Sequence, residues 1–183
     1  MDQPTGTLLA AIVAAFASII CLFVSLANQK GAEFRGAHRK ILEKHIEDLS
    51  EAIHQMLASC DVIVKRIDKG QDVTEWISKF DESKSKIEAI RRKLRYPLWG
   101  IDGGIRSLVR LKDWVLHVKI VPGQQREILD MGEGLRKAVD GAIKYSYVEG
   151  SPPNLFHRVQ VYCRVVMLKR AYKKAMKMSV PAA

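Results

Sequence analysis

The feature that most constrains this chain is a run of 21 residues, from Thr7 to Ala27, without a single charged side chain. As an α-helix the run would be about 31 Å long, which matches the roughly 30 Å hydrocarbon core of a bilayer. Because unpaired backbone amides are costly in lipid, an isolated span has to be helical. The sequence therefore predicts a transmembrane helix over residues 7–27, preceded by a short N-terminal segment over residues 1–6.

A cleaved signal peptide is the main alternative for this run, since Ser25 and Ala27 are small enough to precede a cleavage site. Signal peptides have a positively charged leader and a shorter apolar core. Here the leader carries only Asp2, which favours a retained anchor. A buried helix of a soluble domain is a third alternative, and the length of the run counts against it.

The charges that flank the run predict how the chain crosses the membrane. No Lys or Arg precedes the run, and several basic residues follow it: Lys30, Arg35, Arg39, Lys40 and Lys44. Basic flanks stay on the cytoplasmic side. We therefore expect a single-pass protein of the inner or plasma membrane, with its N-terminus outside, a basic juxtamembrane segment over residues 28–40 and a cytoplasmic C-terminal domain.

Small residues recur every four positions on one face of the predicted span, at Gly6, Ala10, Ala14 and Ser18. Stripes of this kind let two membrane helices approach closely. Self-association through this face is one interpretation, and the general abundance of alanine in membrane helices is the other.

Apolar residues after the span follow an unbroken heptad pattern, which we call the seam. Its members are Leu42, Ile46, Leu49, Ile53, Met56, Cys60, Ile63 and Ile67. This spacing is typical of a long helix that packs along another helix. The pattern leaves open whether the partner belongs to this chain or to another. Helix propensity extends back to Glu33, so the sequence also predicts a continuous rod hinged near Gly31 and Gly36.

A second heptad helix follows after a short turn and predicts an antiparallel, coiled-coil-like hairpin. Gly70 has the position of a left-handed helix terminator, and Asp72 with Glu75 resembles a capping box. The apolar positions of the second helix are Val73, Trp76, Phe80, Ser83, Ile87, Ile90 and Leu94.

Three further helices are expected, over residues 101–119, 124–145 and 155–178, separated by turns at Pro122-Gly123 and Ser151–Asn154. Val115–Val121 and Val159–Val166 are rich in β-branched residues, so each leaves a strand as the alternative. The predicted fold class is all-α: one N-terminal transmembrane helix, then a cytoplasmic antiparallel bundle over residues 41–178 and a tail over residues 179–183.

Recognisable catalytic or metal-binding patterns are missing from the sequence. His38 and His45 are seven residues apart, but further ligands at matching helical offsets are lacking. Glu43, Glu47 and Glu51 form an acidic ridge that we interpret as a solvated face. The glycine cluster at residues 100–104 lacks the spacing of a nucleotide-binding loop. The sequence predicts no enzyme, no cofactor and no metal. We interpret its three cysteines, Cys21, Cys60 and Cys163, as small buried hydrophobic residues in a reducing compartment.

The C-terminal region is strongly basic, because residues 150–183 contain seven basic residues and no acidic one. These residues are Arg158, Arg164, Lys169, Arg170, Lys173, Lys174 and Lys177. Four interpretations stay open: a solvated helix end, contact with the anionic lipid leaflet, nucleic-acid backbone binding and a protein partner. A neighbouring membrane favours lipid over nucleic acid.

The function expected from these features is a non-enzymatic, membrane-tethered interaction or signalling module. It would bind an unidentified cytoplasmic protein or self-associate as a homo-oligomer. One alternative is a membrane-perturbing effector of the toxin or cell-suicide type, activated by clustering of the bundle. A second is recruitment of nucleic acid to the membrane through the basic C-terminal helix.

Overall fold

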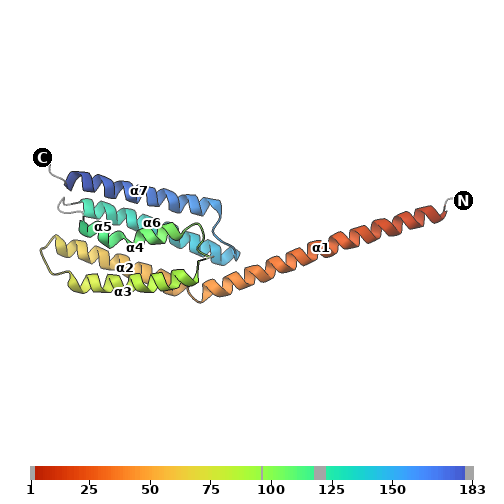
Figure 1. Ribbon diagram of the computed structural model, residues 1–183, viewed down its shortest axis with the longest axis horizontal. Coiled ribbons are helices and arrows are strands. Elements are labelled where there is room, and N and C mark those ends of the chain that lie inside the picture. The colour runs from red at the N-terminus through yellow and green to blue at the C-terminus, as the bar shows by residue number, and fades with distance from the viewer. Residues whose placement is uncertain (1–2, 96, 118–122, 180–183) are drawn as a thin grey trace. The chain divides into compact units, whose positions relative to one another are not determined.

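The computed structural model describes residues 3–95, 97–117 and 123–179, and it is helical apart from short turns over these residues (Figure 1). Side chains are described from Ala14 to Met178 within the same ranges. The helices are α1 (Gln3–Glu43), α2 (Ile46–Ile67), α3 (Thr74–Lys93), α4 (Asp102–Val109), α5 (Leu111–His117), α6 (Gln124–Glu149) and α7 (Leu155–Ser179). The all-α prediction, a candidate membrane span followed by a helical bundle, is confirmed.

The chain divides into two compact units, residues 1–37 and residues 38–183. The first unit consists of α1 up to Ala37. Within it, every described side chain is exposed, and only Gly31 is half-buried. By length and composition, the stretch of α1 that begins at Ala14 qualifies as a membrane span, and none of its apolar window is buried. Among the described residues it is the one helix that qualifies.

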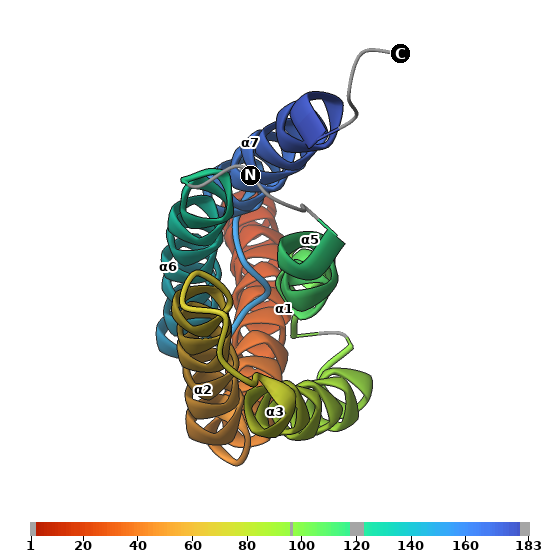
Figure 2. The ribbon, with the colours of Figure 1, turned by 90° about the vertical axis from the view of Figure 1, so that its left-hand side faces the viewer.

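The second unit begins with the last turn and a half of α1 and contains the bundle. Figure 2 shows α2 beside α3 on one side of this unit, with α6 and α7 forming a further packed pair. The short helices α4 and α5 pack against α6, and α4 also contacts α7. Fully buried residues from every one of these helices meet in one apolar core, including Ile53, Phe80, Ile105, Leu135 and Leu168.

The predicted hairpin is present as α2 and α3, which run antiparallel. Gly70 has φ +63°, a left-handed conformation that suits glycine at the end of α2. At the start of α3, Asp72 Oδ1 accepts hydrogen bonds from the backbone N–H of Thr74 at 3.0 Å and from its hydroxyl at 2.7 Å. Glu75, the other half of the predicted capping box, pairs instead with Lys79.

The prediction that the apolar helix runs on past residue 27 is confirmed, whereas the hinge predicted near Gly31 and Gly36 and the unbroken continuation into the seam helix are wrong. The α1 helix runs through both glycines and ends at Glu43, and a turn at residues 44–45 separates it from α2. In this turn the N–H of His45 donates to the carbonyl of Leu42 at 2.9 Å. The turn changes the chain direction while both Leu42 and Leu49 remain completely buried. Because the chain changes direction here, both α1 and α2 contribute buried residues to the core, whereas one straight helix would extend away from it.

The single helix predicted over residues 101–119 is replaced by α4 and α5, which meet at Arg110. Arg110 has φ −87° and ψ −2°, which interrupts the regular helix. The interruption keeps Leu108, Leu111 and Val115 fully buried. Of the two stretches with a strand alternative, Val159–Val166 lies within α7 and residues 115–117 within α5; residues 118–121 lie outside the described residues.

The α6 helix is longer than predicted and ends at Glu149, where Gly150 adopts φ +64°. The chain then turns into α7, and Asn154 Oδ1 accepts a hydrogen bond from the backbone N–H of His157 at 3.0 Å. A side-chain acceptor at this position satisfies an amide that the helix start leaves free. The predicted start of a helix at Ser151–Asn154 is confirmed.

Candidate functional site

The seam lies inside the bundle rather than on its surface. Six of its members are fully buried: Leu42, Leu49, Ile53, Met56, Cys60 and Ile63. Ile46 is half-buried, and Ile67, the last member, is 36% exposed. The partner of the seam is therefore the rest of this unit, chiefly α3 and α6. The seam is occupied by its own chain and offers little surface to another protein.

Burial also inactivates the thiol in the middle of the seam. The apolar surroundings raise the pKa of Cys60 to about 12, with a smaller opposing effect from Lys112. A thiol with this pKa is almost entirely protonated at neutral pH and is a poor nucleophile. Cys21 and Cys163 are exposed, so the prediction that the cysteines are buried is wrong for these two and holds for Cys60.

The residues proposed for membrane-helix packing are described only in part. Ala14 and Ser18 are exposed on α1, and the side chains at Gly6 and Ala10 lie outside the described residues. The hydroxyl of Ser18 donates to the carbonyl of Ala14 at 2.8 Å, within the same helix. This internal hydrogen bond satisfies the one polar side-chain group of the stripe, as a lipid environment requires.

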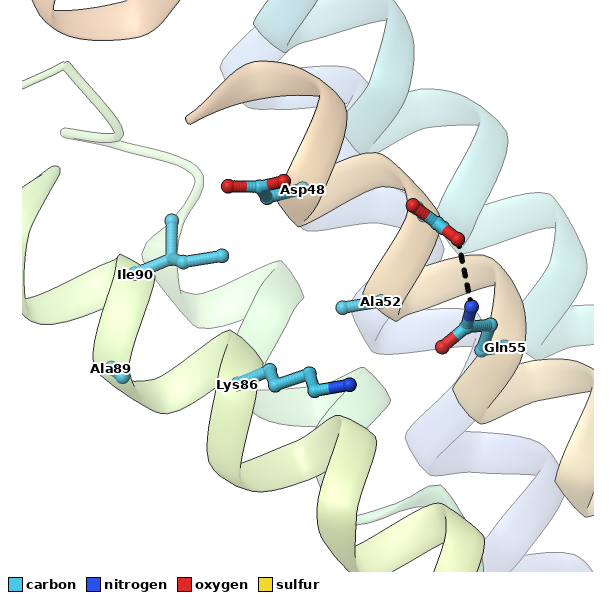
Figure 3. Close-up of a pocket in the computed structure, with 7 residues that line it drawn as sticks. Asp48, Ala52, Gln55, Lys86, Ala89 and Ile90 are labelled. Carbon is cyan, nitrogen blue, oxygen red and sulfur yellow. Dashed lines mark hydrogen bonds between the residues drawn. The ribbon is translucent and has the colours of Figure 1, made fainter. Parts of the chain in front are cut away.

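A groove of about 400 Å³ opens between α2 and α3 (Figure 3). Small and apolar side chains line it, namely Ala52 on α2 and Ala89 and Ile90 on α3. Asp48 and Gln55 lie along the α2 side, while Lys86 reaches across from α3. The groove thus combines apolar side chains with charged groups on both sides.

The polar groups at the groove edges are held mostly by neighbours one helical turn away. Gln55 Nε2 donates to Glu51 Oε1 at 2.9 Å, and Lys86 Nζ lies 2.8 Å from Glu82 Oε1. The hydrogen bond with Glu82 raises the pKa of Lys86 above its usual range. These are exposed pairs within single helices, so they can exchange partners at small cost when another molecule binds.

The acidic ridge is divided by the turn at residues 44–45. Glu43 ends α1, while Glu47 and Glu51 lie on α2, and all three are exposed. Of the two histidines considered as ligands, His38 is buried, with its Nε2 2.9 Å from Ser146 Oγ, and His45 is half-buried in the turn. No group of three His, Cys, Asp or Glu side chains among the described residues is arranged to hold a metal ion.

The basic residues of α7 fall into two groups. Arg158 is engaged within the bundle: its Nε donates to the Pro153 carbonyl at 2.6 Å, and its guanidinium lies 4.0 Å from the centre of the Trp99 ring. The exposed group is Arg164, Lys169, Arg170, Lys173, Lys174 and Lys177. Lys174 has a distant ion pair with Glu127, 3.9 Å apart. The cations therefore remain accessible on α7, with Arg158 as the exception.

One surface feature escaped the sequence analysis, namely a set of exposed apolar side chains on the first half of α7. Its members are Leu155, Phe156, Val159, Tyr162 and Met167, which we call the α7 apolar patch. The sequence did contain a signal for this patch. Val161, Val165 and Leu168 form the buried face of α7, and further apolar residues lie outside that face. The first half of α7 therefore has exposed apolar side chains in addition to the face that it buries in the bundle.

Comparison with known proteins gives no further guide to this surface. No protein-family model, curated protein or solved structure matches the chain.

Proposed function

We propose that this chain is a non-enzymatic, membrane-tethered interaction module. The observation that carries the proposal is the stretch of α1 from Ala14, which has the length and composition of a membrane span and no buried residue in its apolar window. An apolar helix without a protein partner is stable in lipid and unstable in water. The anchor would hold the bundle, residues 38–183, at the cytoplasmic face, as the basic residues after the span favour.

The bundle would bind a protein partner through the groove between α2 and α3. The seam is filled by its own chain, so a partner needs another surface. The groove offers apolar side chains at Ala52 and Ala89 with charged groups on both sides. A helix or an extended segment of a cytoplasmic protein, or of a second copy, would fit such a surface.

The anchor is tested by placing a charge within the apolar run of the full chain. Leu22→Arg puts a guanidinium inside the charge-free run, whereas the control Ala32→Arg puts the same group on the same helix outside the run; both positions are exposed. An arginine inside the hydrocarbon region of a membrane helix is costly, by about 3 kcal/mol or more at its centre. We expect the wild type and Ala32→Arg to remain in the membrane fraction after alkaline extraction, and Leu22→Arg to be released.

Mass determination of the purified protein separates the anchor from a signal peptide. A retained anchor leaves the chain at full length, whereas a mature N-terminus near Asn28 would refute the tether. Labelling of single-cysteine variants from each side of the membrane then tests the proposed orientation.

Partner binding is tested by filling the groove. Ala89→Trp occupies the groove, and Ser78→Trp adds the same side chain at an exposed position of α3 that does not line the groove. Crosslinking in intact cells should lose one partner species in Ala89→Trp and retain it in Ser78→Trp. Equal crosslinking patterns in both variants would exclude the groove as the binding surface.

The membrane-perturbing alternative predicts a different phenotype. Induced expression of a clustered effector would admit a permeability dye, whereas a tethered interaction module leaves the membrane intact. Dye entry that depends on Leu22 would favour the effector.

A further inference from the structure

The outer face of α7 changes character along its length. In the first half, this face carries the α7 apolar patch beside the exposed residues Gln160 and Cys163, with Leu155 at 75%, Phe156 at 70% and Tyr162 at 68% exposure. In the second half, the residues that continue this face at three- and four-residue steps are all cationic: Arg170, Lys173, Lys174 and Lys177. The helix thus presents one face with an apolar half and a basic half, while Val161, Leu168 and Ala175 attach its opposite face to the bundle.

The charge of this face limits what can cover it. No Asp or Glu occurs after Glu149, so α7 has no acidic residue of its own to balance its cations. Exposed apolar and aromatic groups combined with Lys and Arg on one helix are characteristic of binding to an anionic bilayer surface. A second copy of α7 would add a second set of cations, and a nucleic acid would leave Leu155 and Phe156 without an apolar environment.

The chain connection brings this end of α7 within reach of the membrane. Ten residues lie between Ala27, the end of the charge-free run, and His38, the first residue of the second unit, which makes eleven steps along the chain. Even fully extended they cover no more than about 40 Å, and as helix about 16 Å. His38 bonds to Ser146, whose hydroxyl donates to the carbonyl of Ser151 at 2.6 Å. The chain therefore enters the bundle beside the loop that leads into α7.

We propose that the outer face of α7 is a second membrane-binding surface, which docks onto the anionic leaflet in which α1 is anchored. The α7 apolar patch enters the boundary between headgroups and acyl chains, and the basic half contacts the headgroups. This inference rests on the proposed anchor, because the anchor supplies the high local concentration of lipid. Docking would hold one face of the bundle against the bilayer and leave the α2–α3 groove for a partner.

The test uses the full chain in vesicles and a thiol that the protein already has. Cys163 is exposed on α7 between Val159 and Met167, while Cys60 is buried and protonated. In the Cys21→Ala background, an environment-sensitive NBD label on Cys163 reports its surroundings. We expect blue-shifted emission and quenching by nitroxide-labelled lipid in vesicles of phosphatidylcholine with phosphatidylglycerol. In pure phosphatidylcholine both signals should be much weaker.

Matched variants test the two halves of the face. Phe156→Ser with Val159→Ser should abolish quenching, whereas Ile67→Ser, an exposed apolar residue of α2, should leave it unchanged. Lys173→Glu with Lys177→Glu should reduce the equilibrium constant for docking to anionic vesicles by roughly fivefold for each cation removed. Lys69→Glu, in the exposed loop after α2, is the charge control.

The outcomes separate this inference from the anchor. Protein that does not float with the vesicles would refute the anchor. Protein that floats but whose Cys163 label stays unquenched would refute α7 docking alone. Equal quenching in neutral and anionic vesicles would also overturn the docking proposal. So would a label signal that depends on the density of protein in the vesicles, because it would indicate that a second copy covers this face.

Discussion

Adjacent glycines at the start of α4 have opposite roles, which only their packing distinguishes. A Cβ at Gly104 would lie 2.5 Å from Cγ1 of Val161 and 3.1 Å from Cγ2 of Val139, so α4 approaches α6 and α7 there as closely as backbone allows. A Cβ at Gly103 would meet nothing within 4 Å. In the sequence, both belong to the same glycine cluster at residues 100–104. Nothing in the local sequence shows which of the two faces other helices.

Gly104→Ala is therefore expected to destabilise the protein, and Gly103→Ala to stabilise it. The first forces Val161 and Val139 apart, at about 1–3 kcal/mol of unfolding free energy. The second replaces an exposed helical glycine by alanine, which contributes up to about 1 kcal/mol. Urea unfolding of the detergent-solubilised chain, followed by circular dichroism, measures both. Equal effects would mean that α4 does not pack as closely as described.

Arg136 lies between two carboxylates whose environments differ. Its guanidinium contacts Glu133 Oε1 at 2.5 Å and Asp140 Oδ2 at 2.6 Å. The hydrogen bond with Arg136 lowers the pKa of Glu133, whereas burial raises the pKa of Asp140 despite the same arginine. Within the described residues, the Oδ1 atom of Asp140 is also buried without a hydrogen-bond partner. Arg136 thus favours the charged form of both acids, but at Asp140 burial outweighs this effect.

Asp140→Asn should consequently increase stability at neutral pH. A carboxyl whose pKa is raised by folding contributes most to the free energy of unfolding at pH values below its ordinary pKa of 3.8. That contribution is lost as the pH rises through the pKa of the folded state. The difference in free energy of unfolding between Asp140→Asn and wild type should therefore grow, in favour of the variant, between pH 4 and pH 7. Glu133→Gln is the control of opposite sign, because it should lose stability at pH 7 and approach wild type below pH 4.5. Parallel stability profiles for wild type and both variants would contradict the assignment.

At the scale of elements, the periodic segments were predictable and their interruptions were not. The heptad spacing together with Gly70 correctly predicted α2, α3 and the turn between them. The breaks at residues 44–45 and at Arg110 have no proline and no glycine to mark them. Both breaks exist because leucines on either side, such as Leu42 and Leu49, become buried in one core. That is a tertiary constraint, so local sequence could not indicate it.

The heptad pattern of the seam likewise does not distinguish its buried members from its exposed one. Ile63→Ala should cost about 2–5 kcal/mol, because it removes a fully buried side chain from between packed helices. Ile67→Ala should cost much less, since Ile67 is 36% exposed at the end of α2. Thermal unfolding of the two variants measures the difference. Equal losses would indicate that Ile67 is covered by another molecule.

At the scale of the whole molecule, the boundary between the two units lies inside a helix. The second unit begins at His38, and both His38 and Leu42 are buried although they belong to α1. Arg39 also belongs to this contact, since its guanidinium donates to the carbonyl of Val148 on α6. The last turn of α1 is thus part of the bundle, whereas the preceding residues make no buried contact among the described side chains.

Two truncations should therefore behave differently. A chain that begins at Gly31 keeps every buried residue of the second unit, so we expect it to unfold at the same temperature as the bundle of the full chain. A chain that begins at Ile46 loses Leu42 and His38, and we expect its unfolding free energy to fall by at least about 2–5 kcal/mol. Calorimetry in matched detergent compares them. Identical melting of the two truncated chains would show that the end of α1 contributes nothing to the bundle.

The three tryptophans report on different parts of this molecule. The Trp114 ring stacks on Tyr172 with centroids 5.2 Å apart, which connects α5 to the basic half of α7. Trp76 lies under the ammonium of Lys79 at the start of α3. Trp99 is 59% exposed, and Arg158 at the start of α7 covers one side of its ring. Single-tryptophan versions of the protein would therefore resolve, by intrinsic fluorescence alone, whether the two ends of its last helix detach together or one after the other.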